Sequence, residues 1–258
     1  MNIIQLNKFS RLHDGEKIIF CKTDYLLEEF EQVAKKNHDV VLISGNSDYC
    51  ITNDIVRRAP RNIKKWFCQN KYSDSFLLQS IPIGLDNSEE CTRPGHGKAW
   101  EHAKQKQKVL SEPPNKKSDK LIYSNFTVQN NVAHRSLLKQ ISIDTQHITW
   151  SEPNVEYPEY VNSILEHQAV LCAQGNEDGD NHRIYETLYL SRVPLSFSPT
   201  QYRYLHHLFP TVLITNIEDL YDEKLLTKKI SECKKKINNK YLDFDYWKDM
   251  ILDVAEGL

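Results

Sequence analysis

The residues best suited to chemistry in this sequence lie between Gln174 and Leu188, where a polar loop joins an apolar run to an amphipathic segment. Arg183 and Glu186 are three positions apart, so a helix would place both on one face, with His182 beside Glu186. A guanidinium near a helix N-terminus suits a diphosphate, because its paired hydrogen bonds add to the attraction of the helix dipole. Glu186 could accept hydrogen bonds from ribose hydroxyls. The spacing alone is equally typical of a capped surface helix with an internal ion pair.

Glycine is scarce in this chain, which makes each glycine informative. The sequence has 8 glycines among 258 residues, whereas an average protein has about 7% glycine. Gly175 lies in the polar loop, and Gly45 and Gly84 follow apolar runs of the first half. Such positions favour a close backbone approach or a positive φ angle. A plain structural turn is an equally good interpretation of each glycine taken singly.

The second half of the sequence alternates apolar runs with amphipathic segments. This order predicts a mostly parallel sheet with helices on both faces. The apolar runs predict strands at residues 121–126, 147–150, 169–173, 193–197 and 211–214. The amphipathic segments predict helices at residues 132–141, 157–167, 181–190 and 224–236.

The first half has a similar alternation and predicts an irregular Rossmann-type half. Strands are expected at residues 17–21, 39–43, 66–68 and 77–81, and helices at 25–36, 55–65 and 99–110. A segment poor in apolar residues predicts a linker near residues 111–119. We therefore expect an α/β protein with an N-terminal domain at 1–115, a C-terminal domain at 120–240, and an amphipathic helix at 241–258 that packs back on the body.

Composition excludes several classes of protein. With 33 basic and 35 acidic residues the net charge is −2, so a nucleic-acid partner is not expected. No run approaches the roughly 18 apolar residues of a membrane span, and the N-terminus does not resemble a signal peptide. The 6 cysteines are dispersed without zinc-type spacing, which predicts reduced thiols. A soluble, cytoplasmic protein is the expectation.

The polar loop also carries a family resemblance. The segment 175–195 follows the pattern GNxxGDxHRxYExLYLxxxPL, which resembles the C-terminal signature of exostosin-like glycosyltransferases (family 47 and its bacterial and viral relatives). The strongest part is HRxYExL. Segments 44–48, 65–70, 81–85 and 124–126, followed by Arg135, resemble parts of short members in the same order. The resemblance covers about residues 40–217.

This resemblance implies a GT-B fold, in which two Rossmann-like domains face a cleft. It implies that the C-terminal half binds a nucleotide-sugar donor, most simply a UDP-sugar, and that the N-terminal half binds a glycan or polysaccharide acceptor. Arg183 would contact the donor diphosphate and Glu186 the ribose, with Gly175, Asn176 and His182 lining the phosphate pocket. Two further donor-side candidates are Asn125, at the end of the first strand of this half, and Arg135, on the helix that follows.

An inverting transfer also needs a general base beside the attacking hydroxyl. Asp48 is the candidate, because it follows a predicted strand end in the first half and a carboxylate is ionised at neutral pH. An Asx turn or helix cap is the alternative role for Asp48. The remaining acceptor-side candidates are Asn46, Asp86 and His96.

The acidity of the loop leaves two alternatives open. Asp178 and Asp180 form a DxD sequence, the type of motif with which metal-dependent GT-A enzymes hold Mn²⁺ or Mg²⁺ on a donor diphosphate. Such a motif normally lies in the first half of that fold, so the main expectation is a metal-independent enzyme without a cofactor. The second alternative is a module that binds a nucleotide or glycan without turnover.

Overall fold

The computed structural model describes residues 1–86, 103–111, 116–175, 180–197 and 204–258. The chain divides into two compact units. Unit 1 comprises Met1–Lys104 together with Asp243–Leu258, and unit 2 comprises Gln105–Leu242. Each unit contains helices and a sheet whose strands are all parallel. The expected α/β class with two parallel-sheet halves is confirmed.

Unit 1 is built on a sheet with the strand order β1-β2-β3-β4. Its strands are β1 (Ile18–Lys22), β2 (Val40–Gly45), β3 (Ile63–Cys68) and β4 (Leu78–Ser80). Its helices are α1 (Leu6–Ser10), the short 3-10 helix η1 (Thr23–Tyr25), α2 (Leu26–Val33), α3 (Asn53–Arg57) and α10 (Phe244–Glu256). Every residue of β2 is buried, as expected for a central parallel strand covered on both faces.

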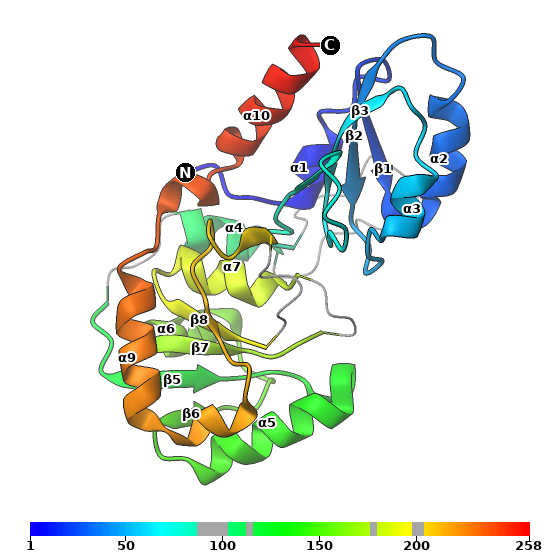
Figure 1. The fold of residues 1–258 in the computed structure, drawn as a ribbon. Coiled ribbons are helices and arrows are strands. Elements are labelled where there is room, and N and C mark those ends of the chain that lie inside the picture. The colour runs from blue at the N-terminus through cyan, green and yellow to red at the C-terminus, as the bar shows by residue number, and fades with distance from the viewer. Residues whose placement is uncertain (87–102, 112–115, 176–179, 198–203) are drawn as a thin grey trace. The chain divides into compact units, whose positions relative to one another are not determined.

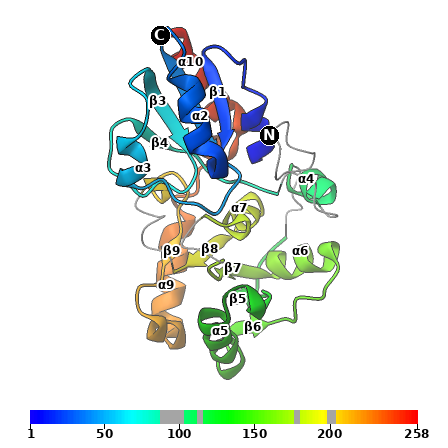
Figure 2. The same ribbon diagram turned by 90° about the vertical axis from the view of Figure 1, so that its right-hand side faces the viewer.

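The C-terminal helix packs within unit 1. α2 covers one face of the sheet (Figure 2). Its Phe30 packs edge-on against Trp66, with ring centroids 5.5 Å apart. α1 and α10 contact β2 and pair Phe9 with Phe244 at 5.1 Å. The sequence predicted that this helix packs on the body but not on which part. The reason is tertiary: α10 buries Phe244, Trp247 and Ile251, and the surface that covers them is formed by segments far away in the sequence, β2 among them.

One predicted helix of unit 1 is wrong. The sequence predicts a helix at 55–65, whereas α3 ends at Arg57 and β3 begins at Ile63. Pro60 accounts for the difference, because proline lacks an N–H donor and disfavours the helical conformation of the preceding residue. The apolar residues after it form a strand instead.

Unit 2 contains a sheet with the strand order β6-β5-β7-β8-β9 (Figure 1). Its strands are β5 (Lys120–Ser124), β6 (Ile148–Trp150), β7 (His167–Cys172), β8 (Val193–Ser196) and β9 (Val212–Leu213). Its α-helices are α4 (Ala103–Ser111, which begins at the unit boundary), α5 (Val132–Asp144), α6 (Tyr157–Glu166), α7 (His182–Tyr189) and α9 (Glu223–Lys234). Its 3-10 helices are η2 (Val128–Asn131), η3 (Ile217–Tyr221) and η4 (Asn239–Leu242).

The helices of unit 2 lie on both faces of its sheet. α5 and α9 share one hydrophobic cluster with the strands through Leu138, Leu226 and Ile230. α6 and α7 cover the other face, where Tyr160 of α6 approaches Tyr123 of β5 at 6.1 Å between ring centroids. The chain therefore leaves β5 toward one face and leaves β7 toward the other. In open α/β sheets, ligands bind outside the carboxyl ends of two such neighbouring strands.

The unit boundary differs from the predicted one. The sequence placed residues up to 115 in the first domain, whereas the residues from Gln105 onward, most of α4 among them, belong to unit 2. Lys106 of α4 forms an ion pair with Glu186 of α7. The sequence predicts a helix at 99–110 and places it before the linker, in the first domain, whereas this contact ties the helix to unit 2.

Candidate functional site

Two loops meet at the carboxyl ends of β5 and β7. Arg135, at the start of α5, donates from Nε to the carbonyl of Gln174 over 2.7 Å and from Nη1 to the carbonyl of Thr127 over 2.6 Å. The side chain of Asn131 caps α5 and also donates to the carbonyl of Gly175 over 3.1 Å. Long-range hydrogen bonds thus hold the loop after β5 against the loop after β7.

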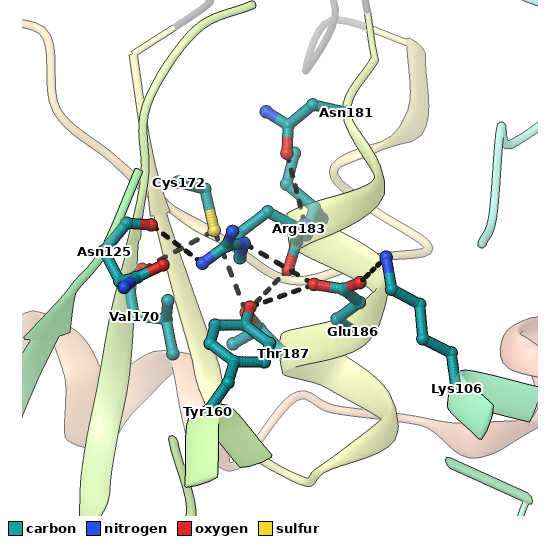
Figure 3. Close-up of polar contacts among 10 residues, drawn as sticks. Lys106, Asn125, Tyr160, Val170, Cys172, Asn181, Arg183, Glu186 and Thr187 are labelled. Atoms are coloured by element: carbon teal, nitrogen blue, oxygen red, sulfur yellow. Dashed lines mark hydrogen bonds and ion pairs between the residues drawn. The ribbon is translucent and has the colours of Figure 1, made fainter. Parts of the chain in front are cut away.

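α7 begins beside these loops and points its N-terminus toward them. Asn181 is the N-cap residue, and its side chain accepts a hydrogen bond from the backbone N–H of Ile184. Arg183 then extends across the sheet edge, where Nη1 donates to the carbonyl of Asn125 over 2.9 Å (Figure 3). Its guanidinium lies over the ring of Tyr160, 4.5 Å from the centroid. The side chain keeps 27% of its surface exposed.

The carboxylate of Glu186 is nearly buried, with 5% of the side chain exposed, and contacts three donors. Oε1 lies 2.7 Å from Nζ of Lys106, and Oε2 accepts from the Tyr160 hydroxyl over 2.9 Å. Nε of Arg183 lies 3.5 Å from Oε2. The one-face arrangement of Arg183 and Glu186 expected from the spacing is therefore present, within a larger network (Figure 3).

Two arginines, Arg135 and Arg183, lie close enough at this edge to influence each other's charge. Burial by itself lowers the pKa of Arg183, but the ring of Tyr160 beneath the guanidinium and the carboxylate of Glu186 favour the charged form more strongly, so this pKa lies above the usual value. Burial lowers the pKa of Arg135, and the nearby charge of Arg183 lowers it further. Burial raises the pKa of Tyr160 well above its usual range, so the phenol remains a neutral donor. Two cations that repel each other at one site favour an anion there.

Several predicted donor-side residues have structural contacts of their own. The amide of Asn125, which is buried, donates to the carbonyls of Ser151 and Glu152 over 3.2 and 2.8 Å. Arg135 uses one N–H of Nε and one of Nη1 on backbone carbonyls, and these bonds fix its guanidinium against the two loops. His182 is the first residue of α7 and half-buried.

The three glycines singled out in the sequence differ in backbone conformation. Gly84 has φ +66°, and an added Cβ would lie 2.3 Å from the carbonyl oxygen of Ile4, so the expected close approach is confirmed there. Gly45 and Gly175 are not among the glycines with positive φ. Around Gly175 an added Cβ would meet nothing within 4 Å. Gly175 is therefore not required by backbone strain, because the backbone there adopts an ordinary conformation. Asn176 lies outside the described residues.

The acceptor-side candidates lie in unit 1. Asn46 follows β2 with φ 56°, and its backbone N–H donates to Oε1 of Gln69 over 2.9 Å. Asp48 is exposed, and within the described ranges its carboxylate forms neither an Asx turn nor a helix cap. Asp86 is buried, and its backbone carbonyl accepts from the side chain of Gln5 over 2.7 Å. His96 lies outside the described residues.

Sequence reasoning missed two members of the network, Lys106 and Tyr160. Lys106 lies in a lysine-rich segment, and nothing local marks one lysine as the partner of Glu186. Tyr160 left a usable signal: it lies on the apolar face of a predicted helix and has a hydroxyl that requires a partner when buried.

The metal-dependent alternative depends on Asp178 and Asp180. Asp180 accepts hydrogen bonds from the backbone N–H of Asn181 and from the hydroxyl of Tyr185, and Asp178 lies outside the described residues. In the part of the chain that the structure describes, no group of three or more His, Cys, Asp or Glu side chains is placed to hold a metal ion. Among the described helices, none has the length and apolar character needed to cross a membrane.

Comparisons with known proteins give likenesses only at the level of structure. No family model matches the sequence, and no curated protein matches it. The chain is similar to a glycosyltransferase from Rickettsia africae ESF-5, with 9% identity, a TM-score of 0.49, and coverage of 98% of this chain and 79% of that chain.

Two further solved structures show similar likenesses. An α,α-trehalose-phosphate synthase (UDP-forming) from Burkholderia vietnamiensis has 10% identity and a TM-score of 0.49, over 98% of this chain and 77% of that chain. The wall teichoic acid polymerase TagF has 13% identity and a TM-score of 0.32, over 97% of this chain and 94% of that chain. All three TM-scores are below 0.5, so these likenesses do not assign a role to any residue of this chain. The resemblance to exostosin-like enzymes stays a prediction.

Proposed function

We propose that this chain is a glycosyltransferase of GT-B type that transfers a sugar from a nucleoside-diphosphate sugar, with UDP as the expected nucleotide, to a hydroxyl of a glycan. The observation that carries the proposal is the position of Arg183. Its partly exposed guanidinium lies at the N-terminus of α7, beside the carboxyl ends of β5 and β7. This is where open α/β sheets bind nucleotides, and the HRxYExL resemblance independently implies a donor diphosphate there.

The chemistry follows from charge. When the nucleoside diphosphate leaves the anomeric carbon, negative charge builds on the phosphate oxygens, and a fixed guanidinium stabilises it. The contacts of Arg183 with Asn125 and Tyr160 hold that guanidinium in place before the ligand binds. We propose an inverting, metal-independent transfer in which Asp48 of unit 1 accepts the proton of the attacking hydroxyl.

The test is binding of UDP and GDP, measured by calorimetry and by the shift in melting temperature. Arg183→Ala should weaken binding by at least about 30-fold, the equivalent of roughly 2 kcal/mol for a lost charge-assisted contact. The matched control is Arg192→Lys. Arg192 likewise donates to backbone carbonyls, those of Lys116 and Leu165, but it is buried and precedes β8, at the N-terminal ends of the parallel strands. Its replacement should lower stability and leave nucleotide affinity unchanged.

Turnover separates an enzyme from a binding module. Asp48→Asn should retain UDP binding and lose sugar transfer, and activity should persist in EDTA. The donor-site proposal fails when neither nucleotide raises the melting temperature of the wild type. A strict Mn²⁺ requirement would favour the metal-dependent alternative, and nucleotide binding without transfer to any glycan would favour the binding module.

A further inference from the structure

Two cations share the carboxylate of Glu186 unequally. Lys106 Nζ lies 2.7 Å from Oε1, whereas Nε of Arg183 lies 3.5 Å from Oε2. The Tyr160 hydroxyl donates to the same Oε2 over 2.9 Å. Lys106 is 19% exposed, and its ammonium also lies 6.0 Å from the ring centroid of Tyr157. Of these two ion pairs, the one with Lys106 is therefore shorter than the one with the helix neighbour Arg183.

This unequal sharing decides how much charge Arg183 can offer to a ligand. Lys106, Glu186 and Arg183 together have a net charge of +1. Without Lys106, Glu186 and Arg183 would cancel each other inside a site where water screens poorly. A carboxylate that turned fully to Arg183 would also occupy the paired N–H groups with which a guanidinium binds phosphate. Lys106 opposes both effects by drawing Glu186 away.

We propose that Lys106 is a positioning residue of the donor site. It holds Glu186 so that the carboxylate neither cancels the positive charge of Arg183 nor occupies the N–H groups with which the guanidinium would bind the diphosphate. This inference rests on the proposed function and refines it. It gives Glu186 a role within the protein, in which the carboxylate orients Arg183 and Tyr160. It also explains why α4, a polar and lysine-rich helix, belongs to unit 2.

The experiment is a double-mutant cycle that removes the charges of Lys106 and Glu186 singly and together. Calorimetry compares the wild type, Lys106→Met, Glu186→Gln and the double variant, each with UDP and with inorganic pyrophosphate. Methionine keeps the length and much of the apolar stem of lysine. We expect Lys106→Met to weaken both ligands by about tenfold or more, the scale of a one-charge coupling between neighbouring groups. Glu186→Gln should bind at least as tightly as the wild type.

The double variant separates positioning from a merely structural role. With both charges removed, Arg183 alone restores the net charge of +1 that the three side chains have in the wild type, so affinity should return to within about threefold of the wild type. Lys139→Met is the matched control, because Lys139 also pairs with a glutamate, Glu152, at 2.8 Å and covers an aromatic ring. That variant should bind both ligands normally. Urea unfolding of each variant shows that the protein measured is folded.

Three results would overturn the inference. Unchanged affinity in Lys106→Met would show that Lys106 does not influence the site. Weak binding in the double variant would show that its role is structural. Loss of UDP binding but not of pyrophosphate binding in Glu186→Gln would place Glu186 on the nucleoside instead. If the wild type binds neither UDP nor pyrophosphate, the proposed function itself fails, and this inference with it.

Discussion

The hydroxyl of Tyr160 offers a sharp test of the buried network in unit 2. It donates to the carboxylate of Glu186 over 2.9 Å, in a residue that is 6% exposed. Because burial raises the pKa of Tyr160 well above its usual range, the phenol remains protonated at any pH at which the protein is handled. Tyr160→Phe removes this donor alone and keeps the ring that lies beneath the Arg183 guanidinium.

The magnitude follows from the charge of the acceptor. A hydrogen bond to a charged group contributes about 1.5–3 kcal/mol, whereas one to a neutral group contributes about 0.5–1.5 kcal/mol. Tyr189 supplies the matched comparison, since its hydroxyl is also buried and donates over 2.7 Å to the neutral carbonyl of Leu242. We therefore expect Tyr160→Phe to lower the free energy of unfolding by roughly 1 kcal/mol more than Tyr189→Phe does.

Urea unfolding at neutral pH measures both variants, and equal m-values ensure that the same transition is compared. Nucleotide affinity of Tyr160→Phe should change little, because the aromatic ring under Arg183 is retained. An equal or smaller loss of stability in Tyr160→Phe than in Tyr189→Phe would refute the reasoning. It would mean that Lys106 and Arg183 satisfy the Glu186 carboxylate without the phenol.

Two further predictions concern backbone strain and buried thiols. Gly84→Ala should lower the free energy of unfolding by about 3 kcal/mol or more, because it adds a clash with Ile4 to a left-handed backbone. Gly15 has φ +80° and its nearest atom lies 3.9 Å away, so Gly15→Ala should lower this free energy by only about 1–2 kcal/mol in the same urea unfolding assay. Equal costs would contradict the clash. Burial raises the pKa of the Cys68 and Cys172 thiols to about 12. The unfolded chain then loses these protons first, so stability falls as pH rises above roughly 8.5, by about 2 kcal/mol per thiol between about pH 8 and pH 10. Replacing both cysteines by alanine should make the free energy of unfolding less dependent on pH in this range. An unchanged pH dependence would refute the role of the two thiols.

Local patterns in the sequence are sufficient to predict most of the helices and strands. The apolar run from Val40 to Ile43 forms β2, because a strand covered on both faces has no polar positions to alternate with. The polar residues before Ile184 begin α7, with Asn181 as its cap. The three-residue spacing of Arg183 and Glu186 likewise places them together, since neighbours on a helix surface are fixed by its periodicity.

Positions far apart in the sequence come together only through tertiary structure. Arg183 contacts the carbonyl of Asn125 because β5 and β7 are neighbours in the sheet, and strand order is not encoded in any local period. Lys106 contacts Glu186 because α4 belongs to unit 2, although the sequence places this helix in the first domain.

The sequence by itself determined the α/β class, the strand-loop-helix around Arg183, and the pairing of Arg183 with Glu186. These depend on periodicity over a few residues, which any reader of the chain can measure. Only the tertiary structure decided that Glu186 is buried beneath Lys106 and Tyr160. It also decided that the last helix packs within unit 1. Those outcomes depend on which apolar surfaces exclude water from one another, and that is settled by the whole fold.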